Sequence, residues 1–273
     1  MKKSFIYNGG KISYYDEGEG DVIVLVHGYL ETSEIYRSIA QKLAADFRVI
    51  SADFPGHGGS DMFGETHTME FMAAVLNALA GSIVEGKIFL AGHSMGGYVS
   101  LAFAELFPEK LKGFSLLHSH PFADTPEVVE KRKTEIRLIN AGKRNMFFAD
   151  SISRMYASDN TGKFAAELER SREIAGTIPD RAVISVLNGM MVRPSRLSIM
   201  EEGRVSCLWI LGVRDNFIDC DQIQGRVRLP GNAEVLVLKN SGHMGFIEEE
   251  EEVLKKISEF VAGSGGNTGN RQC

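Results

Sequence analysis

The stretch that decides the fold lies in the first half of the chain, where residues 87–97 read KIFLAGHSMGG. The first five of these residues have the apolar character of a buried strand, and a helical pattern begins at Gly97. Between them lies a G-x-S-x-G motif centred on Ser94. In this context the serine sits on a sharp, strained turn that lifts its hydroxyl above the sheet. The stretch therefore predicts Ser94 as a nucleophile.

The glycines of this motif have a steric purpose. Gly92 and Gly96 flank the serine, and a side chain at either position would collide with the neighbouring strand or helix. The helix that follows directs free N–H groups and a partial positive charge toward the reaction centre. Both features favour a catalytic turn over an incidental serine.

Further strands and helices alternate on both sides of this motif. Apolar, largely β-branched runs occur at residues 22–26, 48–52, 113–117, 205–211 and 233–238. Helical patterns cover residues 34–45, 69–84, 97–107 and 250–261. At the N-terminus, two alternating stretches around residues 5–8 and 11–16 flank Gly9-Gly10, which is typical of a hairpin. The alternation predicts an α/β fold with a mostly parallel sheet of about eight strands.

One long segment interrupts the alternation. Residues 119–203 show amphipathic helical stretches, such as 127–141 and 164–175, and no convincing strand. We expect residues 1–118 and 204–262 to form the α/β core and residues 119–203 to form a helical lid insertion. Residues 263–273 lack apolar periodicity and are expected to be a disordered tail.

Composition restricts the function further. The 273 residues carry a formal net charge of −6, and no basic run suggests a nucleic-acid partner. No window is long and apolar enough for a membrane span, and the N-terminus lacks a secretory signal, so we expect a cytoplasmic protein. The three cysteines have no metal-ligand spacing, and we expect neither a metal nor another cofactor. Composition leaves the oligomeric state open.

Four motifs in order resemble the α/β-hydrolase fold superfamily, over residues 11 to about 262. They are His27-Gly28-Tyr29, the run from Asp53 to Ser60, the turn around Ser94, and Ser241-Gly242-His243. The chain is similar to small lid-bearing serine esterases and carbon–carbon bond hydrolases of that superfamily. Relatives that act as dehalogenases or epoxide hydrolases carry aspartate where this chain has Ser94, so those reactions are disfavoured.

The resemblance implies which residues activate the serine. Because a serine hydroxyl is a weak nucleophile, a general base must take its proton. His243 lies after the last expected strand, where the family places that base. Asp215 follows the preceding strand and completes the chain order Ser, Asp, His. Asp124 is an alternative acid because some relatives carry it after an earlier strand, and Asp219 and Asp221 lie close to Asp215.

The same resemblance implies an oxyanion hole made of backbone groups. The Met95 N–H, next to the nucleophile, and the Tyr29 N–H, in the loop after the first central strand, would hold the oxyanion. For the substrate pocket we expect side chains from the lid and the nearby strand end: His118, His120, Met146, Phe147 and Tyr156. The lid residues among them could equally form the core of the insertion, and the two histidines could tether it.

The combined prediction is a serine hydrolase that cleaves a small carboxylic ester or related acyl bond. Carbon–carbon bond hydrolysis, lactone opening and perhydrolysis use the same triad and stay open alternatives. From a different class, a slow-turnover small-molecule binding protein could keep the same residues. Neither a nucleic acid nor a membrane is expected as a partner.

Overall fold

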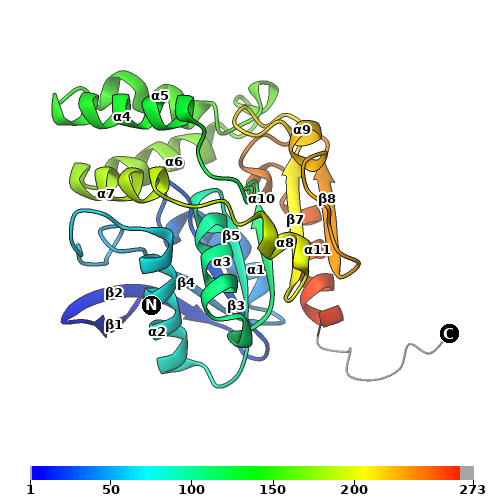
Figure 1. The fold of residues 1–273 in the computed structure, drawn as a ribbon. Coiled ribbons are helices and arrows are strands. Elements are labelled where there is room, and N and C mark those ends of the chain that lie inside the picture. The colour runs from blue at the N-terminus through cyan, green and yellow to red at the C-terminus, as the bar shows by residue number, and fades with distance from the viewer. Residues whose placement is uncertain (1, 265–273) are drawn as a thin grey trace, which may run out of the picture.

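The computed structural model describes residues 2–264 and contains one eight-stranded sheet (Figure 1). The strand order is β1-β2-β4-β3-β5-β6-β7-β8. The β1–β2 and β2–β4 pairs are antiparallel, and the remaining neighbours pair in parallel. The strands are β1 Lys3–Tyr7, β2 Gly10–Glu17, β3 Val22–Val26, β4 Arg48–Ala52, β5 Ile88–His93, β6 Leu111–Leu117, β7 Ser206–Gly212 and β8 Ala233–Leu238. The predicted fold class is confirmed.

The centre of the sheet explains the continuous apolar runs. Every residue of β3 and β5 is buried, because helices cover both faces of the sheet. Trp209 on β7 is fully buried, and its indole N–H donates to the Ser119 carbonyl at 2.8 Å. This bond joins the central sheet to the first residues after β6.

Helices form a layer on each face of the sheet (Figure 1). The helices α1 and α11 pack against each other on one face, and α2 and α3 pack together on the other. The expected helix over residues 34–45 is a 3-10 turn followed by a short α-helix. The bounds are η1 Ser33–Tyr36, α1 Arg37–Leu43, α2 Met69–Ile83, α3 Met95–Leu106, η2 Pro108–Lys110, α9 Cys220–Gln224, α10 Gly245–Glu248 and α11 Glu250–Ser264.

The segment between β6 and β7 is helical. Figure 1 shows α4 to α7 lying across the end of the sheet toward which β7 points. Since parallel strands share one direction, this is the edge where β3, β5 and β6 also end. The elements are α4 Pro126–Asn140, α5 Asn145–Ser153, η3 Ser158–Asn160, α6 Ala165–Thr177, α7 Asp180–Met191 and α8 Leu197–Glu202.

The structure describes only the first two residues of the tail expected over residues 263–273. Residues 263 and 264 are helical, because α11 continues to Ser264, so the expected tail does not begin at residue 263; its residues 265–273 lie outside the described residues. Within residues 2–264, no helix has the length and apolar character that crossing a bilayer requires.

Candidate active site

The turn between β5 and α3 holds Ser94 in a conformation that few residues adopt. Its φ of 49° and ψ of −112° lie outside the regions favoured by L-residues, and such strain is typical of functional turns. A Cβ on Gly96 would lie 2.0 Å from the Val26 carbonyl oxygen, and one on Gly92 would lie 2.3 Å from the Gly96 carbonyl oxygen. The predicted strained turn and its need for glycine are confirmed.

Two loops at the same sheet edge bring Asp215 and His243 together. Asp215 follows β7, His243 follows β8, and the His243 Nδ1 donates to the Asp215 Oδ2 at 2.7 Å. The proton on Nδ1 leaves Nε2 as an acceptor, which is the form a general base requires. The other carboxylate oxygen accepts the amides of Phe217 at 2.8 Å and Ile218 at 3.2 Å. The carboxylate is therefore fixed from both sides.

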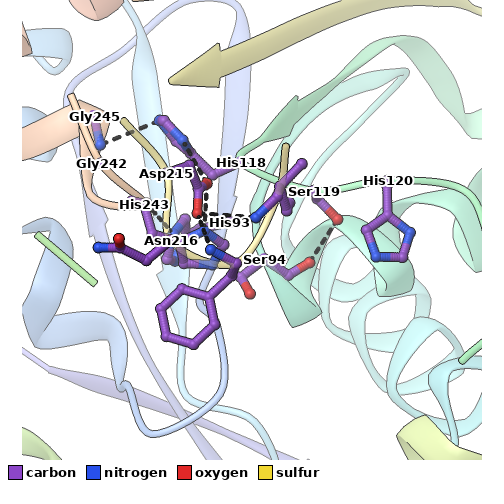
Figure 2. A network of polar contacts seen from close by, with 12 residues as sticks. His93, Ser94, His118, Ser119, His120, Asp215, Asn216, Gly242, His243 and Gly245 are labelled. Carbon is purple, nitrogen blue, oxygen red and sulfur yellow. Dashed lines mark hydrogen bonds and ion pairs between the residues drawn. The ribbon is translucent and has the colours of Figure 1, made fainter. Parts of the chain in front are cut away.

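His243 also lies against the nucleophile turn. The ring centroids of His93 and His243 are 5.0 Å apart, and the His93 Nε2 is 2.8 Å from the His243 carbonyl oxygen. Since Ser94 directly follows His93, the structure brings Ser94, Asp215 and His243 into one cluster (Figure 2). The Ser94 carbonyl is held in addition by the Ser119 hydroxyl at 2.7 Å.

A second histidine contacts the same aspartate. His118 follows β6, has a φ of 47°, and is fully buried with its Nδ1 3.4 Å from the Asp215 Oδ2. Its Nε2 accepts the Gly245 amide at 3.2 Å, so the ring proton must be on Nδ1, facing the carboxylate. Burial lowers the pKa of His118 to about 4 despite the Asp215 charge, so the ring is neutral at pH 7.

His243 and His118 both favour the ionised form of Asp215. Burial by itself would raise the pKa of this carboxyl. The charge interactions with His243 and His118 and the hydrogen bond from His243 outweigh burial, and they hold the pKa of Asp215 well below its ordinary value. The carboxylate is thus ionised throughout the neutral range, as an orienting acid must be.

The three side chains also have the composition of a metal site. His118, Asp215 and His243 offer ligand atoms within 4.8 Å of one another. However, metal-binding nitrogens must be unprotonated, and the Gly245 amide already uses the lone pair on the His118 Nε2. A metal at Nδ1 would require that bond to break, so the group fits a hydrogen-bonding role better than metal coordination.

The two backbone groups expected at the oxyanion hole come from the start of α3 and from the loop after β3. Met95 is the first residue of α3, so the helix itself offers no acceptor for its amide. Tyr29 belongs to the loop after β3, which His27 shapes by accepting the Phe54 amide at 3.0 Å and donating to the Gly28 carbonyl at 2.9 Å. The Tyr29 hydroxyl reaches Glu135 on α4, 3.4 Å away. Its side chain thus contacts the insertion.

The alternative acids have other partners. Asp124 lies between two guanidinium groups, 2.7 Å from the Arg132 Nε and 2.6 Å from the Arg193 Nη1. Asp219 caps α9 by accepting the Gln222 amide at 2.9 Å. Asp221 lies in the first turn of that helix. The structure thus pairs His243 with Asp215.

The expected pocket side chains are more dispersed. Met146 is 73% exposed, whereas Tyr156 is fully buried with its hydroxyl 2.8 Å from the Ser171 hydroxyl. Phe147 is half-buried. His120 bonds the Tyr98 hydroxyl at 3.2 Å and accepts the Phe122 amide at 3.2 Å.

Burial limits which of these side chains could contact a substrate. The Tyr156 ring and the His118 ring are enclosed by protein, so either would need its neighbours to move before it could touch a substrate. Substrate contact by any of the five residues stays a prediction.

Comparisons with known proteins agree with this architecture. A sequence profile for the family described as alpha/beta hydrolase fold matches residues 21–136. A solved esterase from Thermogutta terrifontis superposes with a TM-score of 0.90 at 25% identity, covering 97% of this chain and 99% of that one. This chain has the α/β-hydrolase fold.

Two further proteins are similar to this chain, one in sequence and one in fold. A pimeloyl-[acyl-carrier protein] methyl ester esterase from Stenotrophomonas maltophilia is 28% identical over 256 residues, covering 90% of this chain and 95% of the relative. The enol-lactonase of Burkholderia xenovorans LB400 superposes with a TM-score of 0.86 at 19% identity, covering 95% and 100%. The esterase relatives confirm the expectation of an enzyme of the carboxylic ester hydrolase class.

In this α/β-hydrolase the helical insertion is bonded directly to the loops of the acid and the base. The His243 amide donates to the Met155 carbonyl at 2.7 Å, and the Asn216 side chain donates to the Arg154 carbonyl at 2.8 Å. The buried Glu248 accepts the amides of Gly242 at 2.8 Å and Ala157 at 2.9 Å. The position of the insertion is therefore coupled to that of the His243 loop.

Buried neutral histidines predict that acid destabilises the fold. Burial lowers the pKa of His57 and His120 to about 3 and that of His118 to about 4. Unfolded histidine titrates near pH ~6.5, so below that pH the unfolded chain binds protons that the folded chain does not. This stability is complete above about pH 6.5 and is lost as the pH falls toward 4. Each ring contributes up to about 1.4 kcal/mol per pH unit.

Urea unfolding at pH 7.5, 6.0 and 5.0 tests this prediction. We expect the free energy of unfolding to fall between pH 6 and 5 by up to about 4 kcal/mol, the sum for three rings. A free energy that stays constant over this range would show that the three rings are charged or solvated in the folded protein.

Proposed function

We propose that this chain hydrolyses small carboxylic esters through an acyl-enzyme formed on Ser94. The observation that carries the proposal is the His243–Asp215 hydrogen bond next to the strained turn of Ser94. It leaves an unprotonated imidazole nitrogen beside a nucleophile turn, and a serine hydrolase requires this arrangement.

In the proposed mechanism His243 accepts the hydroxyl proton of Ser94 at Nε2 while the Ser94 oxygen attacks the ester carbonyl. The Tyr29 and Met95 amides stabilise the negative charge on the carbonyl oxygen. The resulting imidazolium is stabilised by Asp215 and then protonates the leaving alkoxide, which departs as the alcohol. Water repeats the sequence on the acyl-enzyme, releasing the acid and restoring Ser94.

We further propose that residues 119–203 act as a lid that selects the substrate. They lie across the sheet edge that holds Ser94, and Tyr29 and His243 both bond to them. The S. maltophilia relative is named for a methyl ester, which has the smallest alcohol as its leaving group. This supports short alkyl esters as the first substrates to assay.

A substrate panel tests the reaction class. Methyl and p-nitrophenyl esters of short acids should be assayed beside lactones, thioesters and cleavable diketones at equal concentration. We expect the highest kcat/KM with the esters. Turnover confined to lactones or diketones would contradict the ester assignment while leaving the triad in place, and no turnover of any compound would favour a binding protein.

A further inference from the structure

A buried carboxylate and a buried imidazole lie directly behind the candidate active site. Glu31, in the loop after β3, is 2% exposed, and His93, the last residue of β5, is fully buried. The His93 Nδ1 is 2.9 Å from the Glu31 Oε1 and 3.0 Å from its Oε2. The Glu31 Oε2 also accepts the Gly28 amide at 2.6 Å.

The neighbours of the His93 ring determine its protonation. A neutral imidazole has one donor and one acceptor nitrogen, but here Nδ1 faces a carboxylate and Nε2 faces the His243 carbonyl oxygen at 2.8 Å. Both nitrogens therefore need a proton. Burial opposes a charge on the ring, but the Glu31 carboxylate outweighs burial and raises the pKa of His93. The pKa of Glu31 is lowered in turn, against its own burial, by His93 and by the Gly28 amide.

The pair connects the three segments on which the proposed reaction depends. Glu31 reaches back to the Gly28 amide and so closes the turn that contains Tyr29. His93 is covalently next to Ser94, and its Nε2 bonds the backbone of His243. A Cβ on Gly28 would lie 2.9 Å from both the Glu31 Oε2 and the His93 Nδ1, so the turn leaves no room for a side chain there.

Stability alone is a weak reason for such a pair. Removing two charges from water costs several kcal/mol per ion, and well-packed apolar residues often replace a buried ion pair without loss of stability. Apolar side chains form no directional hydrogen bonds, so they cannot hold an amide or a carbonyl at a defined distance.

We propose that Glu31 and His93 form an ion pair that positions the oxyanion loop and the base loop relative to Ser94. Both are positioning residues, because they act through Tyr29 and His243 and not on the substrate. The inference rests on the proposed esterase function. It adds two residues to that mechanism which the triad itself does not require.

Matched variants separate positioning from packing. In Glu31→Gln the amide oxygen can still accept from Gly28, and the amide NH₂ can donate to a neutral His93, so every link is kept. In Glu31→Leu both links are lost at similar volume. We expect kcat for p-nitrophenyl acetate to fall about 100-fold or more in Glu31→Leu, the loss typical of one oxyanion donor, with KM nearly unchanged. In Glu31→Gln we expect a change within about 3-fold.

The double variant Glu31→Leu/His93→Phe distinguishes a positioning role from a structural one. An apolar pair of this size should restore the urea midpoint toward the wild-type value. If the pair positions the loops, kcat stays low in this variant although the fold is stable. If kcat recovers together with the urea midpoint, the pair only fills space and the proposal is wrong. A Glu31→Leu variant that is folded and keeps wild-type kcat would also overturn it.

NMR tests the pair without any enzymatic readout. At pH 7 we expect both ring nitrogens of His93 to carry protons in the wild type and only Nε2 to do so in Glu31→Gln. The Gly28 amide should exchange faster in Glu31→Leu than in Glu31→Gln. A singly protonated His93 in the wild type contradicts the ion pair. If the wild type cleaves no ester, the proposed function fails, while these two measurements still decide on the pair.

Discussion

Replacing Ser94 by alanine lowers kcat/KM for a short p-nitrophenyl ester by about 10⁴-fold or more, because no acyl-enzyme can form. We expect a residual rate from substrate binding and from the proposed oxyanion amides of Tyr29 and Met95, which the substitution leaves in place. Ester hydrolysis followed by absorbance, with the uncatalysed rate subtracted, measures the change.

Ser100→Ala is the matched control for that variant. Ser100 lies on α3, the helix that follows Ser94; it is fully buried and donates to the Gly96 carbonyl of its own helix at 2.9 Å. Its loss should change kcat/KM by less than about 3-fold, since such a bond within a helix contributes little. A folded Ser94→Ala protein with activity similar to that of Ser100→Ala would contradict the nucleophile assignment.

Asp215→Asn should lower kcat by about 10⁴-fold while leaving the fold largely intact. Oδ1 accepts two backbone amides and Oδ2 faces two imidazole N–H groups, so an asparagine oxygen can serve only one side. If that oxygen keeps the amides of Phe217 and Ile218, the side-chain NH₂ faces the His243 Nδ1. His243 then takes the other tautomer, with its proton on Nε2, and can no longer accept the Ser94 proton.

The matched control is Asp219→Asn, four residues further along the chain. Asp219 caps α9, and asparagine caps a helix about as well as aspartate. We expect wild-type kcat in this variant. Circular dichroism shows whether both variants are folded. Equal activity in folded Asp215→Asn and Asp219→Asn would show that His243 needs no carboxylate.

Much of the fold and of the candidate site follows from local sequence patterns. The strand, turn and helix around Ser94 are encoded within eleven residues, and their glycines report close approaches of the backbone. Asp215 and His243 are likewise recognisable because each follows a parallel strand, and such strands end at one sheet edge. The chain order Ser, Asp, His of the family then distinguishes Asp215 and His243 from other polar residues in loops.

The contacts between side chains were harder to predict. His118 lies next to Asp215 because β6 and β7 are neighbours in the sheet, although 88 residues separate Leu117 from Ser206 in the chain. The strand order was the missing information. The Glu31–His93 pair depends on the loop after β3, which brings Glu31 next to the last residue of β5, and no periodicity reports such a contact.

The insertion was the least predictable part for a related reason. An amphipathic helix shows which of its residues share a face, but not whether that face meets the substrate or another helix. Tyr156 faces Ser171 within the insertion, and Met146 points outward. Composition gives both residues the same apolar character.

Covalent labelling tests the central claim most directly. Wild-type protein treated with a fluorophosphonate should gain one adduct by intact-mass spectrometry, and peptide mapping should place it on Ser94. Labelling should be absent in Ser94→Ala and slower by at least about 10³-fold in Asp215→Asn, because the probe needs an activated hydroxyl. Folded wild-type protein that stays unlabelled, or an adduct on another residue, would contradict Ser94 as a nucleophile activated by His243 and Asp215.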